Sequence, residues 1–190
     1  FALAFYNRGN ANYDKRDYDR AIKDYNEAIK INPNYALAYY DRGVVYYDRQ
    51  QYDRAVEDLS KAIELDSHDA LAFYNRGLTY RAMGQMDKAL ADFDQSIKLD
   101  PKNPLPYYNR GLALRAARRT EEALEDFNRA IALHPKFAPV RDGRARVLYE
   151  LKRYEEALRD INAAIALDTS RSSAYMDRGY MLHRLGRLEE

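Results

Sequence analysis

The chain has 190 residues, enough for one ordinary domain or one continuous array of repeats. Its 31 lysines and arginines nearly balance 30 aspartates and glutamates, so the net charge gives no overall attraction to nucleic acid or to an anionic membrane. The sequence has no cysteine, which excludes disulfides, thiolate metal sites and a cysteine nucleophile, and it has no apolar run long enough to predict membrane insertion.

A period of 34 residues dominates the sequence. Small residues form three columns at this spacing: Gly9, Gly43, Gly77, Gly111, Ala145 and Gly179; Ala21, Ala55, Ala89, Ala123 and Ala157; and Ala28, Ala62, Ser96, Ala130 and Ala164. A column of larger apolar residues lies between the last two, at Tyr25, Leu59, Phe93, Phe127 and Ile161, and each unit closes at Pro33, Ser67, Pro101, Pro135 or Thr169. Because small side chains let helix axes approach closely, these columns predict packed helical repeats.

Each unit is predicted to contain two helices. In the second unit, apolar residues at helical spacings indicate helices over Leu37–Tyr47 and Tyr52–Leu65. Short breaks separate the two helices of a unit, at Arg16-Asp17, Gln50-Gln51, Gly84-Gln85, Arg118-Arg119 and Lys152-Arg153. Asp17 and Thr120 are predicted to cap second helices, because their side-chain oxygens can accept an unpaired backbone N–H.

The order glycine, alanine, aromatic, alanine and proline over 34 residues resembles the tetratricopeptide repeat. The resemblance covers nearly the whole chain and implies an all-α fold, a right-handed α-solenoid of 34-residue antiparallel helix pairs. The predicted single array over residues 1–190 has five repeats, at about 2–35, 36–69, 70–103, 104–137 and 138–171, and a truncated sixth at 172–190. Since the sequence begins at Phe1 and ends within a unit, we expect it to be a fragment of a longer protein.

Two features depart from the family pattern. The usual early tryptophan is replaced by Phe5, Tyr39, Phe73, Tyr107, Arg141 and Tyr175. The fifth unit has Pro139, Arg141, Asp142 and Gly143 where other units keep leucine and aromatic residues, so we expect its first helix to start late or to be irregular.

The resemblance implies that the first helix of each pair lines a concave face. The candidate peptide-binding residues on it are Tyr6, Asn7, Tyr40, Asp41, Tyr74, Asn75, Arg81, Tyr108, Asn109, Arg115 and Arg146. Of these, we expect Tyr40, Tyr74, Asn75, Tyr108 and Asn109 to be partly exposed. Carboxamides can bond to the backbone of an extended peptide, and tyrosines offer flat apolar area with a polar tip. The sequence therefore predicts a protein–protein interaction scaffold that binds an extended peptide or partner segment in this groove. The plainer alternative is that these residues simply occupy half-exposed helix faces.

The charge of the inner face is predicted to change along the chain. Residues 1–69 hold 10 basic and 13 acidic residues, net −3, and residues 70–190 hold 21 and 17, net +4. This favours an acidic first third and a basic remainder, although ordinary surface scatter is the alternative. A carboxylate clamp for chaperone tails is not predicted, because the positions that need basic residues for such a clamp hold Tyr6, Leu71 and Asn75. The RNA-binding pentatricopeptide repeat has a different period, so no nucleic-acid partner is predicted.

Arginine and aspartate also recur at this period. Arg8, Arg42, Arg76, Arg110, Arg144 and Arg178 precede the glycine column, and Asp24, Asp58, Asp92, Asp126 and Asp160 follow their arginines by 16 residues. Phosphate binding is one interpretation, but we favour a structural pair within each unit, because guanidinium and carboxylate form directional, bidentate bonds. Pairing with the preceding unit is the alternative, and it would give Asp160 to Arg178.

No constellation of residues predicts an enzyme, a cofactor or a metal site. His68, His134 and His183 lie in different units without ligand-like spacing. Two alternatives to groove binding are self-assembly through the array ends and a regulatory array of a larger enzyme. For the C-terminal edge, we expect Tyr175, Met181, Leu182 and Leu185 to lie partly open and to support a homo-oligomer. The localisation is not determined by the sequence, which carries no targeting segment and slightly favours the cytoplasm.

Overall fold

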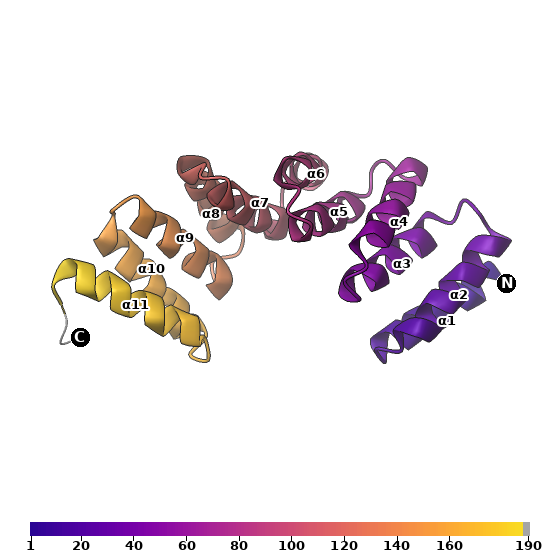
Figure 1. Ribbon diagram of the computed structural model, residues 1–190, viewed down its shortest axis with the longest axis horizontal. Helices are drawn as coiled ribbons and strands as arrows, with labels where there is room; N and C mark the ends of the chain where they lie inside the picture. Colours follow the sequence, from indigo (N-terminus) through magenta and orange to yellow (C-terminus); the bar gives the residue numbers. More distant parts are fainter. Residues whose placement is uncertain (188–190) are drawn as a thin grey trace. The chain divides into compact units, whose positions relative to one another are not determined.

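The computed structural model describes residues 1–187, and within them the chain forms eleven α-helices and no β-strand. The helices are α1 (Ala2–Asp14), α2 (Tyr18–Ile31), α3 (Ala36–Asp48), α4 (Tyr52–Leu65), α5 (Ala70–Ala82), α6 (Met86–Leu99), α7 (Pro104–Ala116), α8 (Thr120–Leu133), α9 (Ala138–Glu150), α10 (Tyr154–Leu167) and α11 (Ser172–Leu185). Consecutive helices pair side by side (Figure 1). The predicted all-α helical-repeat fold is confirmed, and α7 and α8 are separate helices on either side of Arg118-Arg119.

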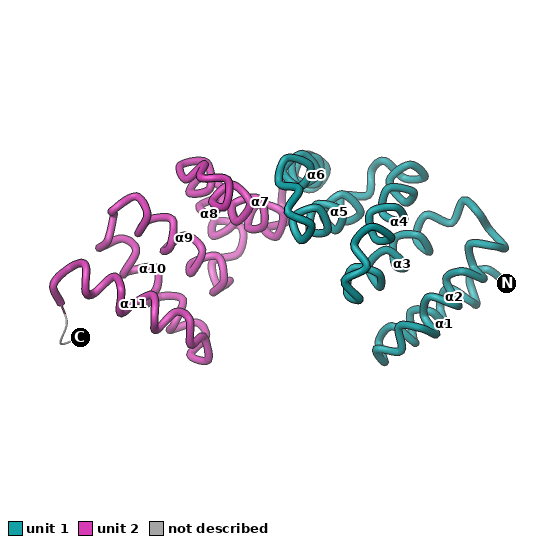
Figure 2. Tube along the Cα trace, viewed as in Figure 1, with its two compact units in different colours: residues 1–100 teal, residues 101–190 magenta. Residues whose placement is uncertain are grey.

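The helices gather into two compact units (Figure 2). Unit 1 is residues 1–100 with α1–α6, and unit 2 is residues 101–190 with α7–α11. Within each unit, the second helix of a pair also packs against the first helix of the next pair, and successive first helices touch. That the whole chain forms one continuous array stays a prediction.

The glycine column lies against the large apolar column of the second helix. A Cβ atom added to Gly77 would stand 2.8 Å from Cε1 of Phe93, and one added to Gly9 would stand 2.6 Å from Cε1 of Tyr25. Real side chains do not approach so closely, so glycine is required where these two helices cross. The alanines of the two columns on the second helices, such as Ala89 and Ala130, are also buried.

The turn inside each pair repeats one backbone conformation. Left-handed residues with φ between 59° and 74° recur every 34 positions, at Arg16, Gln50, Gly84, Arg118, Lys152 and Gly186. After each of them, a backbone N–H bonds back across the turn, as Asp17 N does to Asn12 O at 2.9 Å. This Schellman pattern satisfies carbonyls that the ending helix leaves unpaired. Only two of the six positions carry glycine, the residue that adopts this conformation without strain.

The predicted N-cap Asp17 is confirmed, because its side chain accepts the backbone N–H of Arg20 at 3.2 Å. The predicted N-cap Thr120 is wrong: Arg119 is the N-cap and Thr120 is the first residue of α8. The left-handed residue of the turn sets the start of every second helix at the same register, and this places Thr120 one position too late to cap.

The prediction that the first helix of the fifth repeat starts late or is irregular is also wrong. α9 begins at Ala138 and has 13 residues, like the other first helices of complete pairs. Pro139 lies in the first turn of α9, where a backbone N–H has no partner within the helix and its loss costs nothing.

The recurring arginine and aspartate form a pair within each 34-residue repeat, as predicted. Bidentate bonds of 2.6 to 2.9 Å join Arg8 to Asp24, Arg42 to Asp58, Arg76 to Asp92, Arg110 to Asp126 and Arg144 to Asp160. Several of these arginines also reach the second helix of the preceding pair, as Arg76 does to Ser60 Oγ at 3.0 Å. One guanidinium thereby holds three helices in a common rotation.

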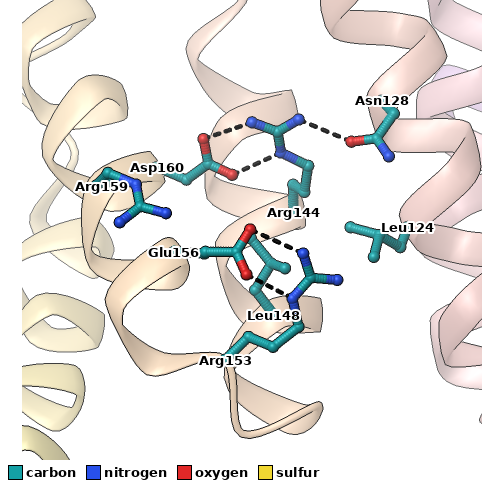
Figure 3. A pocket seen from close by; sticks show the side chains of 8 residues that line it. All are labelled: Leu124, Asn128, Arg144, Leu148, Arg153, Glu156, Arg159 and Asp160. Atoms are coloured by element: carbon teal, nitrogen blue, oxygen red, sulfur yellow. Dashed lines mark hydrogen bonds and ion pairs between the residues drawn. The ribbon is translucent and has the colours of Figure 1, made fainter.

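Figure 3 shows this arrangement around Arg144, beside a hollow of about 190 Å³ on the second-helix side of unit 2. Arg144 bonds to Asp160 and, through its third nitrogen, to Asn128 at 2.7 Å. Nearby, Arg153 forms its own fork with Glu156. A phosphate group would have to displace these carboxylates, so the structural role of the column is favoured.

The face of α11 is only partly open. Tyr175 is exposed and Leu185 is half-buried, as expected, but Met181 and Leu182 are 2% and 8% exposed. The expectation is wrong for these two because they pack in one apolar cluster with α10, including Ile161. The last three residues of the predicted truncated sixth repeat, 188–190, lie outside the described residues.

Candidate functional site

Successive first helices are joined by side-chain bonds between residues 35 apart. In unit 1, the Tyr13 hydroxyl donates to Asp48 at 2.8 Å, and Asn75 Nδ2 donates to the Tyr40 hydroxyl at 2.9 Å. In unit 2, Arg115 Nε donates to Glu150 at 2.8 Å, and Arg184 Nε donates to the Tyr149 hydroxyl at 3.1 Å. We call the surface that carries these bonds, on α1, α3 and α5 of unit 1 and on α7, α9 and α11 of unit 2, the first-helix face.

The predicted tyrosines lie partly in the core and partly at this surface. Tyr6, Tyr40, Tyr74 and Tyr108 are all half-buried, so the prediction that Tyr40, Tyr74 and Tyr108 remain partly exposed is confirmed. The rings of Tyr74 and Tyr108 each lie 6.1 Å from a phenylalanine of the large apolar column. Their binding role stays a prediction, because the same rings also stabilise the packing.

The amide column is more occupied than predicted. Asn7 is exposed and Asn75 is half-buried, but Asn109 is only 5% exposed, so the prediction that it lies partly exposed is wrong. Asn109 folds back onto its own helix and donates to the carbonyl of Leu105 at 3.0 Å. Asn75 does the same with Leu71 and also donates to Tyr40, so both of its N–H groups are used. A peptide would therefore meet the side-chain carbonyl oxygen of Asn75 rather than its N–H donors.

Asp41 occupies the amide column in unit 1 as an ionisable group. Burial raises the pKa of Asp41 above its ordinary value, and a hydrogen bond from the Tyr6 hydroxyl opposes this shift. Burial likewise raises the pKa of Tyr6 to about 12 and that of Tyr40 to about 12. Both tyrosines are therefore neutral at pH 7, and Asp41 is a poorly solvated acceptor for the hydroxyl of Tyr6.

The three predicted arginines of the first-helix face are all half-buried. Arg115 pairs with Glu150, and Arg146 Nε bonds to Asp177 at 2.7 Å and faces Asp142 at 3.4 Å. Arg81 lies in the last turn of α5 in unit 1. The structure thus brings Arg115 and Arg146 to one surface of unit 2 and places each against a carboxylate.

Hollows accompany these side chains in both units. In unit 1, one of about 480 Å³ is lined by Tyr13, Asp14, Arg16, Tyr18 and Asp48. In unit 2, one of about 530 Å³ is lined by Arg115, Arg146, Tyr149, Glu150, Met176, Asp177, Tyr180 and Met181. Sequence reasoning missed Tyr149, Glu150 and Tyr180 as lining residues. The spacing of 35 from Arg115 to Glu150 is a signal that could have found that acid.

None of the helices within residues 1–187 has both the length and the apolar character that crossing a bilayer requires. Across the same residues, no three histidine, cysteine, aspartate or glutamate side chains gather in a way that could hold a metal ion.

Solved structures with the same fold are numerous. Crystal structures of MamA and of YrrB, the latter described as a TPR protein with an unusual peptide-binding site, are 23% and 22% identical to this chain, with TM-scores of 0.79 and 0.77. They align over 87% and 93% of this chain and over 96% and 91% of their own lengths. PilW, described as a widely conserved type IV pilus biogenesis factor, is 18% identical with a TM-score of 0.88, over 99% of this chain and 87% of its own. These likenesses establish the fold.

Among curated protein sequences, nothing matches the chain. Family models do match, and together they cover most of it. A model described as TPR repeat matches residues 9–49 and 43–84, and two described as tetratricopeptide repeat match residues 70–103, 104–137 and 143–190. These matches agree with the helix pairs and with the glycine, alanine and aromatic columns that pack between them. The chain therefore belongs to the tetratricopeptide repeat family.

Proposed function

We propose that this protein is an interaction scaffold that binds an extended peptide segment of a partner protein on its first-helix face. The observation that carries the proposal is the contrast between columns. Alanine and large apolar columns are buried between helices, whereas the tyrosine column stays half-exposed on the first helices, whose other side chains line hollows in both units. Partly exposed tyrosines suit peptide contact, because they offer apolar area at low entropic cost.

Family membership supports the same proposal, since tetratricopeptide arrays present extended binding surfaces. The solved structure of YrrB, which shares the fold, is described as having a peptide-binding site. On this chain, the binding residues proposed in unit 1 are Tyr6, Asn7, Tyr40, Asp41, Tyr74, Asn75 and Arg81, and those in unit 2 are Tyr108, Arg115 and Arg146. Asn109 is left out because it is buried.

A selection from a phage-displayed library of random peptides tests the proposal. The selected peptides are labelled, and their affinity is measured by fluorescence anisotropy for the wild type, for Tyr74→Ala with Asn75→Ala, and for Gln95→Ala with Lys98→Ala. The first variant alters the first-helix face on α5, and the second alters exposed positions on the neighbouring second helix, α6. Only the first variant should weaken binding of peptides that occupy unit 1.

Two results would refute the proposal. Either the library yields no binding peptide, or every selected peptide loses affinity with the second-helix variant and keeps it with the first-helix variants in both units. For unit 2, Arg115→Gln serves as the first-helix variant, and Arg159→Gln on α10 serves as its control.

A second candidate function is self-association through α11. It is favoured by three exposed side chains on one helix: Tyr175 at 41%, Met176 at 58% and Tyr180 at 59%. Light scattering over a range of protein concentrations should then give a molar mass that rises with concentration, and Tyr175→Ser with Tyr180→Ser should abolish the rise. A constant monomer mass would exclude this candidate.

A further inference from the structure

Two hollows on the first-helix face of unit 2 share one ion pair. The hollow of about 530 Å³ described above includes Arg115 and Glu150 in its lining. A second hollow of about 580 Å³ is lined by Leu112, Arg115, Ala116, Arg118, Thr120 and Glu150. The Arg115–Glu150 pair therefore stands between two adjoining spaces, which a short extended segment could occupy together.

Donors outnumber acceptors in this lining. Each guanidinium has five N–H donors, and the contacts of Arg115 and Arg146 within unit 2 use their Nε atoms and one terminal nitrogen. The exposed Arg118 lines the second hollow, and the exposed Arg184 donates from Nε to the hydroxyl of Tyr149, which lines the first. Against these four cations stand three carboxylates, those of Glu150, Asp177 and Asp142, and Asp142 is also paired with Arg171. The surface is thus suited to a ligand that supplies acceptors and negative charge.

Arg146 is held in place for such a ligand. It lies between Asp177, at 2.7 Å, and Asp142, at 3.4 Å, and Asp142 is itself bound by Arg171 at 2.6 Å. Asp142 is buried, and it occupies the position at which the preceding 34-residue repeat has Tyr108. Because the two carboxylates fix the Nε side of the guanidinium while 37% of the side chain stays exposed, little side-chain entropy is lost when an anion binds.

The same hollow has an apolar part. Met176 and Tyr180 are exposed at 58% and 59%, and Tyr149 and Met181 line the hollow beside them. Methionine adapts its shape to different apolar partners, and tyrosine offers a flat face. An apolar side chain can therefore be seated next to the arginines.

We propose that these adjoining hollows select acidic peptide segments, in which an apolar side chain packs on Met176 and Tyr180 and neighbouring aspartate or glutamate carboxylates bond to Arg146 and Arg115. This rests on the proposed function and specifies the partner of unit 2. The hollow of unit 1 has the opposite character, with Asp14 and Asp48 among its lining residues, and does not favour such a segment.

Three labelled peptides of equal length test the charge and the apolar requirement by fluorescence anisotropy at low salt. They are Gly-Ser-Leu-Glu-Glu-Leu-Ser-Gly, the same peptide with lysine for glutamate, and the same peptide with serine for leucine. The first should bind about tenfold more tightly than either of the others, and should weaken as salt is raised, because charged contacts are screened. A lysine peptide that binds as tightly as the glutamate peptide would overturn the inference.

Variants then locate the binding. Arg115→Gln and Arg146→Gln should each weaken the acidic peptide by about tenfold, as expected for loss of a charge-assisted bond. Arg159→Gln removes an exposed arginine of α10 and should leave the affinity unchanged. Arg146→Gln leaves two carboxylates facing each other and can therefore disturb the fold. Met176→Ser changes an exposed side chain without this effect, and it should weaken binding of the acidic peptide that carries leucine but not of the peptide with serine in place of leucine.

The measurements separate a failure of the acidic-peptide inference from a failure of the proposed function. If library peptides bind but none of the variants of unit 2 affects the acidic peptide, the inference is wrong and the proposed function stands. If neither the library nor the three peptides bind, both are wrong.

Discussion

The left-handed turn residues predict a stability gain that can be calculated from the backbone. Lys152 has φ of 60° and an exposed side chain, and it ends α9 in the same turn that Gly84 forms after α5. A left-handed residue with a Cβ atom costs about 1–2 kcal/mol. Lys152→Gly removes this strain and loses about 0.5–1 kcal/mol through the greater freedom of glycine in the unfolded chain. The net expectation is a gain of about 0.5–1 kcal/mol.

Thermal unfolding followed by circular dichroism measures this gain. For a chain of this size it corresponds to a rise in Tm of roughly 1–4 °C. Gln50→Gly tests the same turn in unit 1, and the two gains should add because the sites share no contact. Amide hydrogen exchange near each turn shows where the gain arises, which matters because repeat arrays can unfold in parts.

Gly84→Ala is the matched control. Its φ of 74° is unfavourable for alanine, so this variant should lose about 1 kcal/mol, although a Cβ atom there would meet nothing within 4 Å. A lower Tm for Lys152→Gly, or an unchanged Tm for Gly84→Ala, would refute the reasoning, because both outcomes require that backbone strain is absent from these turns.

Three further predictions concern unit 1. Asp58→Ala should cost about 3 kcal/mol in urea unfolding, because it strands the guanidinium of Arg42 between helices; a loss below about 1 kcal/mol would contradict the bridging role. Gly77→Ala should cost about 1–3 kcal/mol, because its Cβ would stand 2.8 Å from Phe93, and an unchanged Tm would show that the ring can move. The raised pKa of Asp41 means that the folded chain holds this proton at a pH where the unfolded chain has lost it, so stability falls as pH rises through the folded pKa. Asp41→Asn should therefore be more stable than the wild type at pH 7, with the difference shrinking toward about pH 4, and a difference independent of pH would refute the burial argument.

The sequence by itself determined the fold. The 34-residue period, the small columns and the large apolar column encode which faces must meet, because only glycine permits the close crossing seen at Phe93 and Tyr25. It also predicted the arginine–aspartate pairs, since a constant separation of 16 residues spans the two helices of one unit. These features depend on local spacing, which a repeated sequence displays several times over.

The candidate site could be predicted only in part. The tyrosine column and the two arginines of unit 2 lie at the first-helix face as predicted, since helical periodicity determines the face on which each residue lies. Periodicity does not determine what each side chain bonds to. Asn75 was expected to offer donors and has none left, and Asn109 was expected at the surface and is buried.

Only the tertiary structure decided the remaining features, because they depend on contacts between neighbouring pairs. Glu150 meets Arg115 across successive first helices, and Asp142 and Asp177 hold Arg146 from two different helices. Such partners come together through the packing of one pair on the next, which a list of columns does not contain. The opposite character of the hollows in the two units has the same physical origin: each depends on which few charged side chains the packing leaves at the surface.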